Sequence, residues 1–171
     1  MNINKFSQKQ KRSGYRAQAM VEFAIALPVL LLLLFGIMEV GRMALIYTMV
    51  TNASRDASRY ASAVGRGDDL LFKYNHCAGI KQAAIDSTYN LVAIAPSDIL
   101  ISYVDENGVS AGTCDATSGE DPDITVDSEY RVTVQVKAYY TRVVTLIPIP
   151  SRWITSTSTR TILGIYELPN P

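Results

Sequence analysis

The sequence predicts an α+β protein: a long N-terminal transmembrane helix that continues into a small soluble domain with a second helix and an antiparallel sheet. Three observations predict this fold. Residues 17–50 are almost continuously apolar, over more than the roughly 20 residues that a helix needs to cross a bilayer. Residues 130–140 alternate between apolar and polar side chains, which is typical of a half-buried strand. Asn107-Gly108 is a strong signal of a tight hairpin.

The long helix is predicted from about residue 17 to about residue 64, where glycines stop it, with its membrane-spanning part ending near residue 46. The 16 residues 23–38 carry no charge. Lys and Arg are concentrated before this stretch, which by the positive-inside rule puts the N-terminus in the cytoplasm. The rest of the chain would then lie on the opposite side of the membrane. A cleaved signal peptide would have a shorter apolar region, whereas an uncleaved signal anchor stays open.

Charge segregation and composition limit the function classes. The 16 basic and 16 acidic residues cancel, but residues 1–17 carry five basic residues and no acidic one, which leaves −5 for residues 18–171. An acidic body disfavours a nucleic-acid-binding domain. His76 is the sole histidine, so a His-rich metal site is excluded, and no nucleophile motif accompanies it. We therefore expect no enzyme, no cofactor and no metal site.

Glu22 is the unusual residue of the apolar segment. A carboxylate costs about 2–3 kcal/mol at the centre of a bilayer, and it is a functional-site candidate by default. Two simpler interpretations are a position at the headgroup level and an interaction with the positive end of the helix dipole. A cut after Ala17 would make Gln18 the first residue and Glu22 the fifth.

That spacing resembles the processing site of type IV pilins, and residues 16–61 resemble the TadE-like family of tight-adherence (Flp) pilus pseudopilins. The resemblance covers about a third of the chain, and Ala17 stands where the family usually has Gly. The matching elements are Val21-Glu22-Phe23-Ala24, Pro28, residues 30–35, Glu39, Gly41-Arg42, Ala53, Arg55, Ala57 and Arg59-Tyr60-Ala61.

The resemblance implies a pilin-like protein that a prepilin peptidase cuts between Ala17 and Gln18. It divides the chain into a basic leader (1–17), a long helix (18–64) and a periplasmic α+β domain (65–171). It also implies that the processed chain acts in pilus assembly or priming as a minor pseudopilin, first in the inner membrane and then in the extracellular pilus. The implied partners are the peptidase, sister pseudopilins, the major pilin, the inner-membrane assembly platform and the lipid bilayer.

On the physical side, cleavage would create an α-amine with a pKa near 7.7–8 that can pair with Glu22 of the same or a neighbouring subunit. The alternative function is an uncleaved, membrane-anchored periplasmic binding or adhesion module. A membrane-tethered hydrolase is a poor third interpretation.

Beyond the membrane, the helix carries an apolar stripe that we expect to pack on the protein's own domain, on other pseudopilins, or on both. Further elements are a second helix within residues 68–95, clearest over 80–92, and strands at 99–104, 130–140 and 153–162, the last near a sheet edge. The stripe comprises Ile46, Val50, Ala53, Ala57, Tyr60 and Val64.

Cys77 and Cys114 are the only cysteines, and in an oxidising compartment a disulfide between them is expected. Two free thiols are the alternative. A zinc site with His76 lacks a fourth ligand. The acidic residues within 115–127 predict a solvated loop rather than a calcium site, because they lack the order of an EF-hand.

Overall fold

The computed structural model describes residues 7–66, 72–114, 130–145 and 149–162. The chain divides into two compact units, one made of residues 1–42 with 142–149 and the other of residues 43–141 with 150–171. Each unit is described by itself. The predicted acidic loop within residues 115–127 lies outside the described residues.

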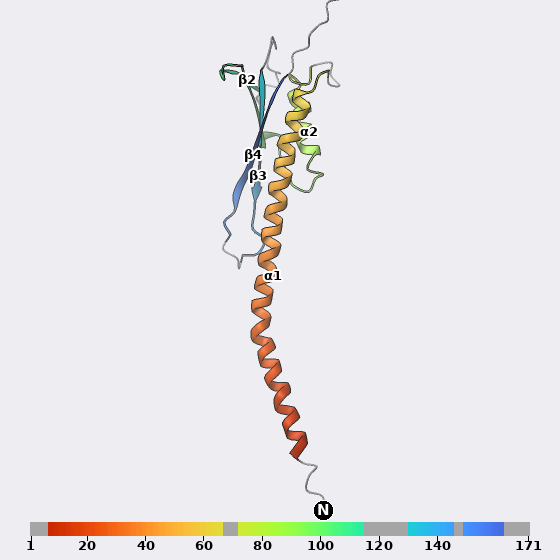
Figure 1. The fold of residues 1–171 in the computed structure, drawn as a ribbon, viewed down its shortest axis with the longest axis vertical. Helices are drawn as coiled ribbons and strands as arrows, with labels where there is room; N and C mark the ends of the chain where they lie inside the picture. The colour runs from red at the N-terminus through yellow and green to blue at the C-terminus, as the bar shows by residue number, and fades with distance from the viewer. Residues whose placement is uncertain (1–6, 67–71, 115–129, 146–148, 163–171) are drawn as a thin grey trace, which may run out of the picture. The chain divides into compact units, whose positions relative to one another are not determined.

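Helix α1 (Ser7–Ser62) is the longest element of the fold and contributes to both units (Figure 1). It ends two residues before the predicted position, and Gly65 follows with φ +117°, a conformation that side chains other than glycine rarely adopt. It begins at Ser7, ten residues before the predicted start. Its helical backbone therefore runs through the expected junction between leader and helix.

Four antiparallel strands form the sheet, in the order β2-β1-β3-β4. The strands are β1 (Ile99–Val104), β2 (Ser110–Cys114), β3 (Arg131–Tyr140) and β4 (Arg152–Thr161). The strands predicted at 99–104, 130–140 and 153–162 are thereby confirmed to within one residue at each end, and β4 is an edge strand as expected. The Asn107-Gly108 hairpin joins β1 to β2, with Gly108 at φ +80°.

The core of the second unit lies between the sheet and the C-terminal part of α1 (Figure 1). Alternate residues of β3, from Val132 to Tyr140, are buried. On α1 the buried positions include Ile46, Val50, Ala53 and Ala57, which confirms this part of the predicted stripe.

Small side chains allow α1 and β4 to come close together. The Ser54 hydroxyl lies 3.1 Å from that of Ser156, and the Ser58 hydroxyl lies 2.8 Å from that of Ser158. Both helix serines are fully buried, and each also donates to a carbonyl one turn back in α1. Buried hydroxyls therefore keep partners within a tightly packed contact.

The end of the predicted stripe is wrong. Val64 is 63% exposed, because it lies beyond the last residue of α1, and Ala61 is buried in its place. Tyr60 is only half buried, with its hydroxyl 3.3 Å from Nδ1 of His76.

Helix α2 (Cys77–Asp86) is shorter than predicted and lies earlier in the chain. The expected segment 80–92 was too long at its C-terminal end. Tyr89 and Asn90 adopt left-handed backbone conformations, with φ of +50° and +57°, which stops the helical path. Apolar residues at Leu91 and Val92 suggested a longer helix, but they follow this turn.

A disulfide joins Cys77 at the start of α2 to Cys114 at the end of β2, with the two Cα atoms 5.8 Å apart. The expected bridge is present. Cys114 is the last residue of strand β2. The Tyr103 hydroxyl lies 3.4 Å from Cys114 Sγ and donates to the carbonyl of Tyr74, which adds a second connection beside the bridge.

Candidate functional site

The N-terminal part of α1 exposes an apolar surface that its own chain does not cover. Between residues 17 and 38 every side chain is exposed except those at 35 and 36, which are half buried. Met20, for example, is 75% exposed, and Phe23 is 64% exposed. A soluble protein rarely leaves so many large apolar side chains in water. The helix is long and apolar enough to cross a membrane, as the sequence predicts.

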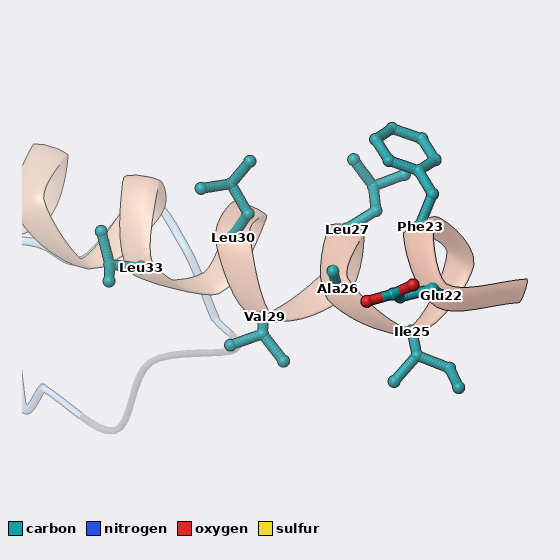
Figure 2. Close-up of a pocket in the computed structure, with 8 residues that line it drawn as sticks. All are labelled: Glu22, Phe23, Ile25, Ala26, Leu27, Val29, Leu30 and Leu33. Atoms are coloured by element: carbon teal, nitrogen blue, oxygen red, sulfur yellow. The ribbon is translucent and has the colours of Figure 1, made fainter. Parts of the chain in front are cut away.

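Glu22 lies on this apolar surface as the only charged residue between positions 17 and 38. Figure 2 shows its carboxylate running along the helix toward Ala26, with Phe23 and Leu27 on one side and Ile25 on the other. These side chains and three residues of the next turns line a shallow groove on the helix surface. The remaining lining residues are Val29, Leu30 and Leu33.

Glu22 is the one polar side chain among the residues that line the groove. The groove therefore offers a partner one anionic contact that is surrounded by apolar contacts. Once lipid or other helices cover this surface, a cationic group would meet Glu22 there without water. In a low-dielectric setting such a pair is attractive, and either charge alone is costly.

Ala17 and Gln18, the predicted processing residues, are both exposed on α1. The peptide bond between them is part of continuous helix. A peptidase that reads an extended backbone must first unwind about one turn here. Gln18 and Glu22 are four residues apart, so their backbone positions lie on one face of the helix.

Pro28 follows the groove and lies inside α1. Its ring nitrogen has no hydrogen to donate, so one helical hydrogen bond to the carbonyl four residues earlier is missing. The helix continues through this position, in agreement with the sequence analysis.

Glu39 is a functional candidate to which the sequence analysis assigned no role beyond its place among the elements that match the TadE-like family. Its carboxylate is buried, with 1% of the residue exposed, and Oε1 accepts hydrogen bonds from the backbone N–H groups of Val143 (2.6 Å) and Val144 (2.7 Å). The guanidinium Nε of Arg42 lies 3.6 Å from Oε2. A carboxylate that accepts two amide protons fixes the segment after β3 to α1 within the first unit.

A sequence signal for Glu39 existed. It is an acidic residue in a mostly apolar segment, and an arginine follows three residues later, one turn along the helix. The sequence could not indicate that the partner would be the backbone about one hundred residues away.

The disulfide region shows no sign of metal chemistry. Among the described residues no group of three or more His, Cys, Asp and Glu side chains converges. Both cysteines are bonded to each other, and His76 contacts Tyr60 instead.

Residues 17–59 match the TadE-like protein family. The match covers about a quarter of the chain and lies wholly within α1. It confirms the resemblance that residues 16–61 carry and indicates a protein associated with the Tad pilus system. No curated protein and no solved structure matches the chain.

Proposed function

We propose that this protein is a minor pseudopilin of a tight-adherence (Flp) pilus, which a prepilin peptidase processes and which acts in pilus assembly or priming. The observation that carries the proposal is the coincidence of the TadE-like segment with an uncovered apolar helix. Residues 17–59 match the family, and residues 17–38 expose large apolar side chains along that helix.

An apolar helix of this kind has two stable environments, the bilayer and a bundle of similar helices. Moving it from lipid to water would expose most of its apolar surface at about 25 cal/mol per Å². Helices of sister pseudopilins or of the major pilin would cover that surface. We therefore propose that the exposed half of α1, residues 17–38, packs against the helices of other subunits during assembly.

Processing after Ala17 would change the charge at the end of this helix. Removal of residues 1–17 eliminates five basic side chains, which favour retention on the cytoplasmic side. The new α-amine of Gln18 would lie on the same helix face as Glu22. It would pair with this carboxylate in its own subunit, or with Glu22 of a neighbour once helices pack together.

The role is non-enzymatic in this proposal, and the partners are other proteins and lipid. The peptidase and the assembly platform act at the inner membrane, sister pseudopilins and the major pilin pack along α1, and the domain at 65–171 lies in the periplasm. After assembly it would be carried into the extracellular pilus.

Intact-mass measurement of the protein from its own cells tests processing directly. A chain that begins at Gln18 supports the proposal. Ala17→Asp should block cleavage because it places a charge where a small side chain is required, whereas Ala17→Gly, which restores the usual residue of the family, should be cleaved. A chain that keeps residues 1–17, in cells whose pili are unaffected by its deletion, favours the anchored periplasmic binding module instead.

Glu22→Gln tests the assembly role without a change in side-chain size. We expect normal membrane insertion and normal cleavage but few or no pili by electron microscopy, because the amine would lose its anionic partner. Glu22→Asp keeps the charge and should restore pili in part. Normal piliation with Glu22→Gln would contradict this role.

A further inference from the structure

The face of the sheet that points away from α1 carries a polar surface that the assembly role does not use. Along β3 the exposed or half-buried residues alternate with the core residues, and their cross-strand partners on β1 and β4 lie on the same face. Most of these side chains are threonine, serine or glutamine. We call this surface the outer sheet face.

Hydroxyl and amide groups form two rows across the outer sheet face. In the first row Ser102 pairs with Thr113 on one side and with Thr133 on the other, and Thr133 pairs with Thr159. The hydroxyls of Thr133 and Thr159 are 3.0 Å apart. In the second row Gln135 lies between Leu100 and Thr157, and its amide nitrogen is 3.4 Å from the hydroxyl of Thr157.

A groove of about 480 Å³ lies over these rows. Among the described residues that line it, none is charged, and the polar ones are Ser97, Ser102, Thr113, Thr133, Gln135 and Thr157. The volume falls within the range of roughly 300–1,000 Å³ that is typical of small-molecule sites. The groove therefore offers several neutral donors and acceptors to one ligand.

Aromatic side chains continue the same face at its far end. Tyr139 pairs with Trp153 across β3 and β4, with ring centres 5.1 Å apart in an edge-to-face arrangement. Both rings are about half exposed, Trp153 at 52%. Lys137 Nζ lies 5.2 Å from the Trp153 ring centre and 3.9 Å from the Asp98 carboxylate, so the charge beside the aromatic pair is balanced.

These features select one class of ligand. A polyanion would need several unpaired cations over the groove. An apolar partner would remove water from the donors and acceptors of the two rows that the Thr133–Thr159 and Gln135–Thr157 contacts leave unused. A sugar chain presents hydroxyls to the rows and flat C–H faces to Trp153 and Tyr139, whose rings combine apolar area with a polar tip. We propose that the outer sheet face binds a neutral oligosaccharide chain of a polysaccharide.

Trp153 makes the test specific to this face, because it is the only tryptophan of the chain. The full-length protein, in a zwitterionic detergent without a sugar headgroup, is titrated with hexa-N-acetylchitohexaose and with cellohexaose while its fluorescence is recorded. We expect a saturable change in emission with at least one of the two. Absence of any saturable change up to about 10 mM of either sugar would overturn the proposal.

A double variant tests whether sugar binding depends on the hydroxyl rows rather than on any exposed threonine. Thr133→Val with Thr157→Val keeps branched side chains that suit a strand and removes two hydroxyls from the groove. Loss of two neutral hydrogen bonds should weaken binding about tenfold. Thr48→Val, on the exposed side of α1, is the matched control and should bind as the wild type does.

Two other outcomes would overturn the proposal. Equal binding of the acidic hexamer of galacturonate would show that neutrality is not selected. A change in Trp153 emission that depends on protein concentration, without sugar, would assign the face to a second copy of the chain. The uncleaved Ala17→Asp variant should bind like the wild type, so failure of sugar binding and failure of the pseudopilin role are distinguishable.

Discussion

The two halves of α1 have opposite relations to their surroundings, although both belong to one continuous helix. In the N-terminal half, large side chains such as Met20, Phe23 and Leu32 are exposed. In the C-terminal half the fully buried residues are alanines and serines, such as Ala53 and Ala57, with Val50 as the one larger side chain. Side-chain size therefore separates the part that needs a partner from the part that already has one.

The difference has a simple physical cause. Alanine and serine let a helix backbone approach a sheet closely, and the hydroxyls of Ser54 and Ser58 are satisfied by β4 serines and by α1 carbonyls. Long apolar side chains form a wide surface instead, which lipid or other helices can cover. One continuous helix thus combines a fixed internal interface with an open external one.

The largest expected effect comes from the disulfide, which is in the second unit. Cys77→Ser should lower the free energy of unfolding of this unit by about 3–4 kcal/mol, because the bridge closes a loop of 37 residues. The measurement is thermal unfolding followed by near-ultraviolet circular dichroism in detergent.

The helical circular dichroism signal of residues 17–38 is the internal control for Cys77→Ser. Residues 17–38 are far along the chain from the bridge, and in detergent they should stay helical when the sheet has melted. A single transition in which sheet and apolar helix unfold together would contradict the separation of the two halves.

The second effect is overpacking at the helix–sheet contact. Ala57→Leu adds three carbons at a fully buried position and should destabilise the fold by about 1–3 kcal/mol. Ala24→Leu makes the same change on the exposed half and should leave the unfolding midpoint unchanged. Equal shifts for the two variants would show that the buried contact is not tightly packed.

Much of this fold could be predicted because the signals are local. The alternation in β3 places each buried valine, and the Asn107-Gly108 pair places the first hairpin. The apolar length of α1 indicates a membrane helix, and Glu22 is conspicuous because it is the only charge within that surface. Each of these signals lies within one continuous segment of the chain.

What the sequence could not predict depends on tertiary contacts or on backbone conformation. The two hydrogen bonds of Glu39 join residues 104 and 105 positions apart. Helix α2 ends where Tyr89 and Asn90 adopt positive φ, a conformation that tyrosine does not signal. Val64 fits the helical period but lies past the end of the helix, so periodicity alone placed it in the core.

The third effect compares the two carboxylates of α1 directly. Glu39→Gln keeps the shape but removes the charge that accepts the N–H groups of Val143 and Val144. We expect amide exchange at these two residues to become about tenfold faster, equivalent to about 1.4 kcal/mol. Hydrogen exchange by mass spectrometry at residue resolution measures this.

Glu22→Gln is the matched control, because the substitution is the same but the carboxylate lies on the exposed surface. It should leave the exchange of Val143 and Val144 unchanged while it disturbs assembly. If Glu22→Gln accelerated exchange at these residues as much as Glu39→Gln does, the division between one internal and one external carboxylate would be wrong.

The smallest effect is the alkaline titration of Tyr74, which lies in the second unit. Burial raises the pKa of the Tyr74 phenol above its usual value of about 10. Above pH 10 the unfolded chain therefore loses this proton before the folded chain does, and stability falls as pH rises. Tyr74→Phe should make the decline of the unfolding midpoint above pH 10 shallower, without a change in slope below it. Tyr89→Phe removes a phenol that is 79% exposed and is the control; an equally reduced decline in both variants would show that burial of Tyr74 does not contribute.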